Sequence, residues 1–263
     1  MVLAAGAGTR LLPLTERTPK ALCPVGDRTL LDHALDALRE ALGAEEPGTL
    51  AVNSHHHAGM LAEHVARNWP GVHVEREQPE ALGTAGAIGN LRRWLAGRPV
   101  LVTNADTIHD ADLRAFVRAW DRERVAVLST GVDFGPSSSV IASVLPATVA
   151  ASLSTEPSGL WEVVWRRESD AGRLQVVAQA ARIIDCGTPR RYLDANLAWL
   201  DGSDGWVHPT AEASGRVVES VVGAGAVVRG SVRRSVVWPR SVVDDGEQLV
   251  GSIRTVDSTV VVA

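Results

Sequence analysis

The chain has 263 residues, of which 45% are hydrophobic and 22% are charged, so it can bury the core of one large domain or of a large and a small domain. Its formal net charge of −5 argues against nucleic acid or an anionic membrane surface as a partner. No apolar run approaches the ~18–20 residues of a membrane-spanning helix, and Cys23 and Cys186 form no CxxC pattern. We therefore expect a cytoplasmic protein in a reducing compartment.

The first predicted strand, "MVLA", leads directly into a glycine-rich turn with Gly6 and Gly8. Bare backbone at these positions allows a ligand to approach closely. The GxxxxGK[ST] phosphate motif is absent, and the dinucleotide fingerprint lacks its third glycine because Leu11 stands there. What remains is a nest of backbone amides followed by Arg10, whose guanidinium can bridge phosphate oxygens.

Lys20 is the only lysine of the chain, and every other basic residue except histidine is an arginine. Pro13 and Pro19 predict an ordered loop between the glycine-rich turn and Lys20, which brings the lysine back towards the turn. A lysine ammonium is a compact point charge that suits a phosphate. The turn, Arg10 and Lys20 together therefore predict a phosphate-binding segment.

Apolar strand patterns alternate with amphipathic helical patterns up to about residue 200. The predicted strands are 1–4, 50–54, 72–77, 100–105 and 125–130, and the predicted helices are 29–42, 58–69, 84–95 and 110–123. This alternation predicts a Rossmann-like α/β domain with a mostly parallel sheet and helices on both faces. Ligands of such sheets lie at the carboxyl ends of the strands.

Two aspartates follow apolar segments and are not needed as helix caps. Asp106 follows a predicted strand, and Asp110 and Asp112 are available to cap the next helix. Asp185 precedes Thr188, which is expected to cap a helix with a proline in its first turn. Two carboxylates together with substrate phosphates are a ligand set that Mg²⁺ prefers.

The three consecutive histidines at 55–57 raise the possibility of a zinc site. Adjacent residues do not point in one direction on a helix or a strand, and the sequence offers no HxxxH or CxxC partner. We therefore favour a structural role in a loop, with proximity to a sugar as the alternative.

The texture of the sequence changes at about Trp206. "SVVG" at 220–223 recurs as "SVVW" at 235–238 and as "SVV" at 241–243. Valine pairs roughly every six positions predict a solenoid with inward valines, and a pair of β-hairpins is the alternative. At ~18 residues per coil the tail has fewer than three coils, which would have to pack on another domain or subunit. The predicted domains are 1–203 and 204–263.

The segment "LAAGAGTRLLPLTERTPKAL" at 3–22 resembles the signature of the sugar nucleotidyltransferases, also called nucleoside-diphosphate-sugar pyrophosphorylases. Four further segments are similar to that family: "VNSHHHAGML", "LGTAGAI", "VTNADT" and "DCGTPRRYLDAN". The tail resembles the short left-handed β-helix of guanylyl- and adenylyltransferase members. The chain is most similar in character to mannose-1-phosphate guanylyltransferase-like members.

The resemblance implies transfer of a nucleoside monophosphate from an NTP to a sugar 1-phosphate, with release of pyrophosphate. GTP and a mannose 1-phosphate-like sugar are the expected pair, and uridylyl, thymidylyl or adenylyl transfer are alternatives. It also implies a Mg²⁺ ion on Asp106 and Asp185, and catalysis by Arg10, Lys20 and Asp106. Arg10 would hold the leaving pyrophosphate, and Lys20 the α-phosphate or the sugar phosphate. The implied nucleotide-binding residues are Ala5, Gly6, Gly8, Thr9, Arg10, Gln78, Gly83 and Thr84.

The chain departs from the family pattern in one important place. Family members carry a further lysine after the middle strands that grips the sugar phosphate, and this chain has none. Arg166, Arg167 or Arg173 could substitute for it. One alternative function is therefore a catalytically degenerate nucleotide-sugar-binding regulator. An acyltransferase is a more distant alternative, because it needs a catalytic histidine between coils and His208 is the single histidine of the tail. We expect a homo-oligomer, formed through the β-helix.

Overall fold

The computed structural model describes residues 1–43 and 48–262, which form two compact units. The first unit comprises Met1–Ala7 and Leu31–Ile183, and the second comprises Gly8–Leu30 and Ile184–Ala263. The chain therefore leaves the first unit just before Gly8 and returns to it at Leu31. This division differs from the predicted boundary between 203 and 204, which stays a prediction about independently folding domains.

The first unit is built on a seven-stranded sheet with the order β10-β8-β9-β6-β1-β4-β5. Four of its neighbouring pairs are parallel, whereas β9 runs antiparallel to both β6 and β8. The prediction of a mostly parallel sheet is therefore confirmed. The strands are β1 (Val2–Leu3), β4 (Ala51–Ser54), β5 (His73–Arg76), β6 (Val100–Asn104), β8 (Ala126–Ser129), β9 (Val140–Leu145) and β10 (Gln175–Ala178).

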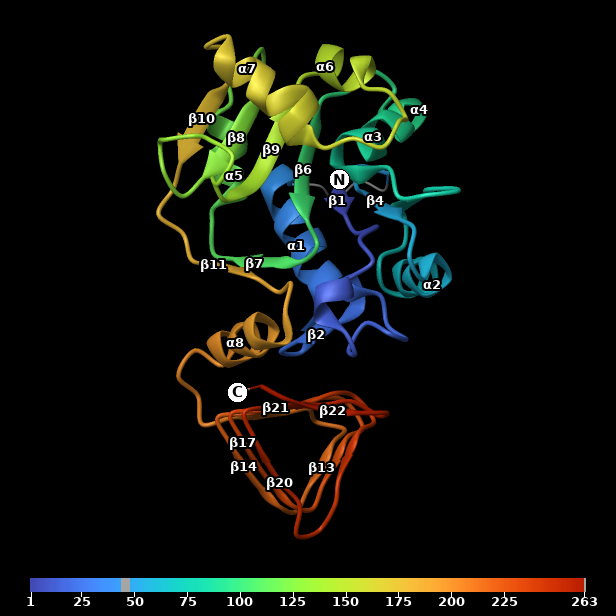
Figure 1. The fold of residues 1–263 in the computed structure, drawn as a ribbon, viewed down its shortest axis with the longest axis vertical. Coiled ribbons are helices and arrows are strands. Elements are labelled where there is room, and N and C mark those ends of the chain that lie inside the picture. The colour runs from blue at the N-terminus through green and yellow to red at the C-terminus, as the bar shows by residue number, and fades with distance from the viewer. Residues whose placement is uncertain (44–47, 263) are drawn as a thin grey trace. The chain divides into compact units, whose positions relative to one another are not determined.

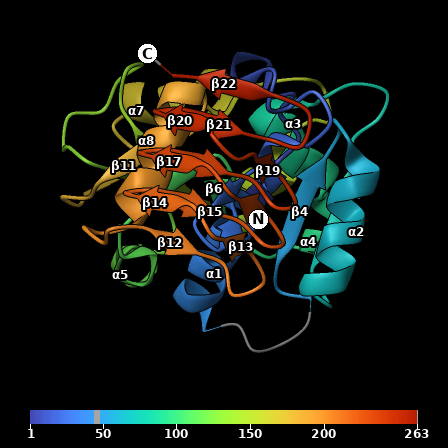
Figure 2. The same cartoon turned by 90° about the horizontal axis from the view of Figure 1, so that it is seen from below.

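Helices cover both faces of this sheet, as predicted. Figure 2 shows α1 and α5 on one side and α3 and α7 on the other. No helix within residues 1–43 and 48–262 has both the length and the apolar character that a bilayer-spanning segment needs. The helices of this unit are α1 (Leu30–Leu42), α2 (Ala58–Asn68), α3 (Gly83–Asn90), α4 (Arg92–Leu95), α5 (Leu113–Ala119), α6 (Ala147–Ser152), the π-helical turn η3 (Trp161–Trp165) and α7 (Arg166–Asp170).

Local sequence explains where these helices begin and which face they bury. Leu31, Leu35 and Leu38 lie on one face of α1 and are fully buried, as an amphipathic helix requires. The side chain of Asp112 caps α5 by accepting a hydrogen bond of 2.7 Å from the Ala115 amide, which confirms its predicted role. Asp106 is therefore not the cap of that helix.

The second unit begins with the loop that carries the phosphate-binding motif. It contains two 3₁₀ turns, η1 (Thr9–Leu11) and η2 (Lys20–Leu22), and the short hairpin β2 (Pro24–Val25) and β3 (Arg28–Thr29). After β11 (Ile183–Asp185), helix α8 (Pro189–Trp199) follows, with Thr188 as its cap and Pro189 in its first turn, as predicted.

Helix α8 fastens the hairpin through side chains on its buried face. The Tyr192 hydroxyl donates to the Pro24 carbonyl, and the Asn196 side chain accepts from the Gly26 amide at 3.0 Å. Gly26 has a φ of +63° and its Cα lies against the Trp199 indole ring, so a larger residue would clash there. The segment that follows Lys20 is thus held by the helix that follows Asp185.

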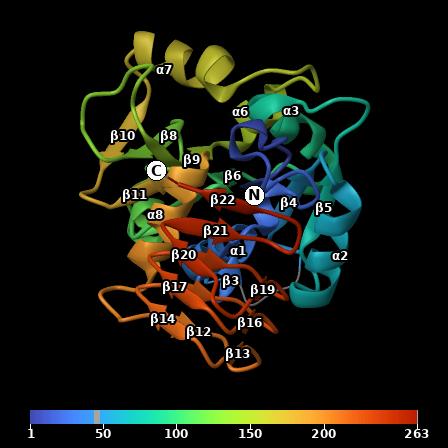
Figure 3. The same cartoon turned by 60° about the horizontal axis from the view of Figure 1, so that its bottom comes forward.

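The tail forms a β-helix, which confirms the predicted solenoid. Its coils are triangular in cross-section (Figure 1), with one parallel ladder of strands along each wall. Strands β14, β17 and β20 lie side by side in Figure 3. The walls are β12 (Trp206–Val207), β15 (Val221–Val222), β18 (Val236–Val237), β21 (Ser252–Arg254) and β22 (Thr259–Val261); β13 (Glu212–Ala213), β16 (Val227–Val228) and β19 (Val242–Val243); and β14 (Arg216–Val218), β17 (Ser231–Arg233) and β20 (Gln248–Val250).

The expected coil length of about 18 residues is wrong. Val221 pairs with Val236 and Val227 pairs with Val242, so one coil advances the chain by 15 residues, or five per wall. The first wall therefore stacks four parallel layers, from Trp206 to Ile253, instead of fewer than three. Antiparallel strand β22 then pairs with β21 at the end of that wall. Each wall alternates outward side chains with fully buried valines, among them Val222, Val228, Val237 and Val243.

A ladder of buried serines runs through one corner of the β-helix. The Ser220 hydroxyl accepts from the Ser235 amide at 3.0 Å, and the Ser235 hydroxyl accepts from the Ser252 amide at 3.0 Å. Each of these hydroxyls also donates to the carbonyl two residues earlier, at 2.7 to 2.9 Å. The ladder satisfies backbone groups at a corner where the sheets are interrupted.

We expect Ser235→Ala to lower the free energy of unfolding by about 1–3 kcal/mol, because it leaves the buried Ser252 amide without its acceptor. Thermal unfolding followed by circular dichroism measures the change. Ser258→Ala, in the terminal hairpin and outside the ladder, is the matched control. An effect no larger than that of the control would contradict the ladder's stabilising role.

Candidate active site

The glycine-rich turn is stitched together by hydrogen bonds to the Gly8 carbonyl. The Leu11 amide donates to it at 2.9 Å and the Thr15 hydroxyl at 2.8 Å, which folds the loop back onto the turn. Gly8 has a φ of +66°, and a Cβ there would lie 2.9 Å from Thr15 Cγ2 and 3.0 Å from Lys20 Cβ. Only glycine fits at this position, and the fit places the stem of Lys20 beside the turn, as the sequence predicted.

The two glycines of the turn have different surroundings. A Cβ at Gly6 would meet no described atom within 4 Å, and Gly6 is exposed. We expect Gly8→Ala to lower the free energy of unfolding by about 1–2 kcal/mol, because it forces a β-carbon into the left-handed region. We expect Gly6→Ala to leave the melting temperature unchanged but to raise the KM for an NTP about tenfold or more, because it blocks an amide that faces a phosphate.

Melting curves and initial rates on the two variants test this pair together. Equal losses of stability would contradict the structural role of Gly8. An unchanged KM in Gly6→Ala would contradict the placement of the NTP at the turn.

Arg10, Lys20 and Asp185 converge within the second unit. Lys20 Nζ lies 4.0 Å from Asp185 Oδ1. A Cβ on Gly187 would lie 2.8 Å from that same Asp185 oxygen and 3.0 Å from Arg10 Nη2, so both groups lie over its Cα. Residues separated by 175 positions in the sequence (10 and 185) therefore meet around one glycine. The predicted neighbourhood of the two cations and this carboxylate is confirmed within the unit.

The burial of these three groups is graded. Lys20 is only 8% exposed, Asp185 is partly exposed, and Arg10 is exposed. A buried ammonium needs a nearby negative charge, and Asp185 supplies one when no phosphate is bound. An incoming phosphate would meet an ammonium whose position is fixed by packing and a guanidinium that can adapt.

Cys23 follows this cluster directly but is not a nucleophile. It is fully buried, and burial raises the pKa of its thiol, while the nearby charge of Lys20 has the opposite, smaller effect. The side chain therefore stays a neutral thiol near pH 7. Burial likewise raises the pKa of the Tyr192 hydroxyl, which donates to the Pro24 carbonyl.

In the first unit, a buried polar network joins the start of the turn to helix α3. The Asn53 side chain accepts from the Ala4 amide at 2.7 Å and donates to Glu77 Oε1 at 2.7 Å. Glu77 Oε2 accepts from the Leu82 amide at 2.8 Å. Asn53 is 2% exposed and Glu77 is 1% exposed. Sequence reasoning missed both residues, although a charged residue directly after a predicted apolar strand was the available signal.

The glycines of "LGTAGAIGN" have a packing role that was not expected. A Cβ on Gly83 would lie 2.5 Å from the Ser158 carbonyl oxygen, and one on Gly86 would lie 2.5 Å from that of Glu156. Gly89 faces the Ser154 carbonyl in the same way. The three glycines recur every three residues on one face of α3, which packs directly against the backbone of 154–158. Contact of Gly83 with a base stays a prediction.

The other predicted nucleotide residues of the first unit lie at the same end of the sheet. Ala5 is buried directly after β1, and Gln78 is exposed after β5. The Thr84 hydroxyl accepts from the Leu160 amide at 2.7 Å, so it is tied to η3. Thr9, in the second unit, is exposed in η1. Their contacts with nucleotide stay predictions.

Asp106 follows β6 at the carboxyl edge of the sheet and is partly exposed. It accepts a hydrogen bond of 3.4 Å from the Thr107 hydroxyl. Among residues 1–43 and 48–262, no three histidine, cysteine, aspartate or glutamate side chains gather into a metal-binding group. The residues thus fit an ion such as Mg²⁺, which takes one or two carboxylates and obtains its other oxygens from water and substrate. Asp106 belongs to the first unit and Asp185 to the second.

The histidines at 55–57 occupy the turn into α2, as the structural interpretation predicts. His55 Nδ1 lies 3.2 Å from the Glu77 carbonyl, and His57 starts the helix with a φ of +50°. Burial, with smaller contributions from His57 and His55, lowers the pKa of His56. In the part of the chain that the structure describes, they belong to no metal-binding group.

Comparison with known proteins extends these observations. The family model described as "Nucleotidyl transferase" matches residues 1–136. The chain is 40% identical over 136 residues to an N-acetylmuramate alpha-1-phosphate uridylyltransferase of Caulobacter vibrioides, covering 48% of this chain and 54% of that protein. It is 24% identical over 238 residues to a probable mannose-1-phosphate guanylyltransferase 2 of Arabidopsis thaliana, covering 76% and 65%.

Solved structures give the same fold. HddC from Yersinia pseudotuberculosis, complexed with GMP-PN, superposes with a TM-score of 0.59 at 19% identity, over 75% of this chain and 97% of that one. The chain spans about half the length of the uridylyltransferase relatives that it matches. The family match covers 136 of the 263 residues and includes the whole glycine-rich turn with Lys20. The chain therefore belongs to the nucleotidyl transferase family.

Proposed function

We propose that this protein transfers a nucleoside monophosphate from an NTP to a sugar 1-phosphate, forming an NDP-sugar and releasing pyrophosphate. The observation that carries the proposal is the convergence of Arg10, Lys20 and Asp185 beside the glycine-rich turn. A buried ammonium and an exposed guanidinium at a turn of free amides form an anion site without a base or nucleophile nearby. Such a site suits phosphoryl and nucleotidyl transfer, which depends on positioning and charge stabilisation.

The chemistry asks little of the side chains as acids or bases. An oxygen of the sugar 1-phosphate attacks the α-phosphorus of the NTP, a new O–P bond forms, and the bond from the α-phosphorus to the bridging oxygen breaks. The attacking monoester has a second pKa near ~6 and is largely ionised at neutral pH, so no general base is required. The electron pair of the broken bond leaves with pyrophosphate.

The residues act by holding two anions together. We assign Lys20 to the α-phosphate or the sugar phosphate, where a compact charge bridges two phosphates, and Arg10 to the leaving pyrophosphate. The backbone of Gly6 and Gly8 supplies amides to the same triphosphate. Asp106 and Asp185 are the proposed ligands of Mg²⁺, which when bound neutralises phosphate charge.

The finer proposal is that the substrates are GTP and mannose 1-phosphate. The Arabidopsis relative named for guanylyl transfer supports it through the extent of its match, 76% of this chain. Relatives named for uridylyl transfer at higher identity make UTP the first competitor. The base is therefore the first variable of the test.

Pyrophosphate release, measured with Mg²⁺ and every pairing of four NTPs with a set of sugar 1-phosphates, tests the proposal. We expect release to depend on both substrates. If every pair is silent while an NTP still binds in calorimetry, the protein is a binding relative and the proposed catalysis is wrong.

A further inference from the structure

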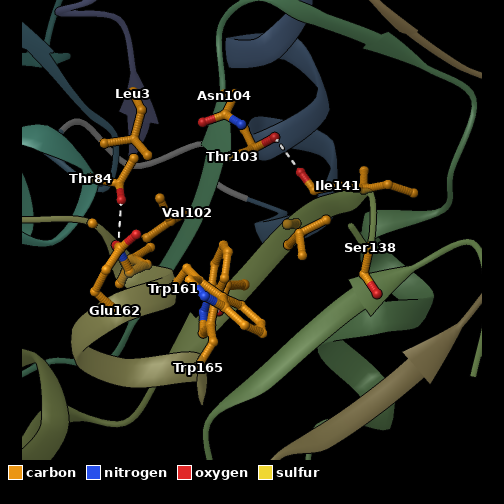
Figure 4. Close-up of a pocket in the computed structure, with 15 residues that line it drawn as sticks. Leu3, Thr84, Val102, Thr103, Asn104, Ser138, Ile141, Trp161, Glu162 and Trp165 are labelled. Carbon is orange, nitrogen blue, oxygen red and sulfur yellow. Dashed lines mark hydrogen bonds between the residues drawn. The ribbon is translucent and has the colours of Figure 1, made fainter. Parts of the chain in front are cut away.

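A cavity of about 320 Å³ opens at the carboxyl edge of the first unit's sheet. Leu3, at the end of β1, and Asn104, at the end of β6, line it together with Thr84 (Figure 4). The first residues of antiparallel β9 reach the same edge, because Ala142 pairs with Thr103. The volume lies at the lower end of the range for small-molecule sites. Ligands of doubly wound sheets bind at this edge.

One wall of the cavity is aromatic. Trp161 and Trp165 from η3 both line it, and their rings lie next to each other in Figure 4. Phe134 packs on both indoles, with ring centroids 5.7 Å and 6.3 Å away. Trp165 Nε1 donates to the Ser143 hydroxyl at 3.1 Å, which fixes the orientation of that ring. The π-helical geometry, often found at functional sites, presents both rings on one side.

The polar groups of the cavity are neutral with one exception. Thr84, Asn104 and Ser138 contribute hydroxyl and amide groups. Glu162 is the one ionisable residue of the lining, and its carboxylate lies over the Cα of Gly159, which also lines the cavity. The arginines considered as substitutes for the missing lysine do not line it. Arg173 instead forms a two-armed pair with Glu168, with both contacts at 2.9 Å.

From these observations we propose that the cavity holds the sugar ring and selects sugar 1-phosphates whose ring substituents are uncharged. The apolar face of a pyranose or cyclitol ring would stack on Trp161 and Trp165, and its hydroxyls would bond to Asn104, Ser138 and Glu162. A carboxylated sugar would bring a second negative charge next to Glu162 with no cation to offset it. This inference rests on the proposed function and adds the class of acceptor.

Two matched substrate pairs test the selection. Glucose 1-phosphate and glucuronate 1-phosphate differ at one carbon, and N-acetylglucosamine 1-phosphate and N-acetylmuramate 1-phosphate differ by a carboxylated ether. We expect kcat/KM to favour the uncharged member of each pair by about tenfold or more, as for like charges a few ångströms apart in a partly hydrated site. In Glu162→Gln, which preserves volume, we expect the preference between glucose and glucuronate 1-phosphates to fall at least fivefold, roughly.

Glu168→Gln is the control, because that carboxylate pairs with Arg173 and does not line the cavity. An unchanged preference in Glu162→Gln, or an equal change in the control, overturns the inference even if turnover is normal. Trp165→Leu supplies a second test, with an expected rise of about tenfold in the KM for the sugar phosphate and no change in that for the NTP. Equal changes in both KM values would contradict the stacking role.

Calorimetric binding of the same sugar phosphates separates this inference from the proposed function. If no pair turns over but the uncharged members still bind more tightly in a Glu162-dependent way, the selection is correct and the proposed catalysis is wrong. If neither turnover nor binding shows any preference, the inference is wrong.

Discussion

Lys20→Met is expected to lower kcat/KM for pyrophosphate release by about 10²–10³-fold, as for the loss of one fixed donor to a developing anionic centre. Methionine retains an unbranched stem, so the packing of residue 20 against Gly8 is preserved while the charge is lost. The ammonium is only 8% exposed, so water does not replace it efficiently. Initial rates together with melting temperatures check the prediction.

Two further variants sharpen this result. Lys20→Arg keeps the charge but spreads it over a planar group too broad for a position between two phosphates, so we expect it to recover only part of the rate. Arg17→Met removes a cation from the same loop whose side chain is 78% exposed and paired with Asp257, so we expect rates near those of the parent chain. Full activity in Lys20→Met would remove the basis of the proposed mechanism.

Glu77→Ala is expected to lower the free energy of unfolding by about 3 kcal/mol and to raise the KM for an NTP. It deprives the Asn53 side chain and the Leu82 amide of their buried acceptor, and breaking a buried charged network is costly. The same bonds hold the start of the glycine-rich turn through the Ala4 amide. A loss of this size corresponds to a melting temperature lower by about 6–12 °C for a chain of this length.

Glu80→Ala is the matched control for Glu77→Ala, because Glu80 is an exposed carboxylate in the same loop. We expect its effect on stability to be within about 0.5 kcal/mol. Indistinguishable melting curves for the two variants would show that the Asn53–Glu77 bonds do not support the turn.

The elements that the sequence predicted best are those whose patterns have one physical cause. Buried parallel strands and amphipathic helices follow from hydrophobic period, and the predicted segments match β4, β6 and β8 and the helices between them. The glycine-rich turn was recognisable because Gly8 and the prolines fix the backbone locally. The meeting of Lys20 with Asp185 was predicted from a long family motif rather than from periodicity.

The parts that were missed depend on contacts far apart in the sequence. Antiparallel β9 (Val140–Leu145) lies in the segment that resembles nothing in the family, and its direction is set by pairing with β6 and β8. The packing role of Gly86 and Gly89 requires the backbone of 154–158, which no local pattern announces. The aromatic wall of the cavity likewise depends on how η3 packs against β9.

The coil length was wrong because valine pairs alone do not count the corner residues. Five residues per wall instead of six leave a shorter turn at each corner, which is closed by residues in the left-handed region such as Glu219 and Arg234. The buried serine that follows each of them completes the corner. A repeat of left-handed corner residue and serine was the signal available in "ESVV" and "RSVV".

The fifteen-residue coil restricts how the length of this protein can change in evolution. Removing or duplicating one whole coil returns every later residue to its own wall, whereas most other lengths would turn valines outwards and arginines inwards. The last coil shows the one kind of exception: Ser231 pairs with Gln248, 17 residues on, and the two additional residues lie in the corner between β19 and β20. Corners can therefore absorb small insertions, while the walls tolerate only complete turns.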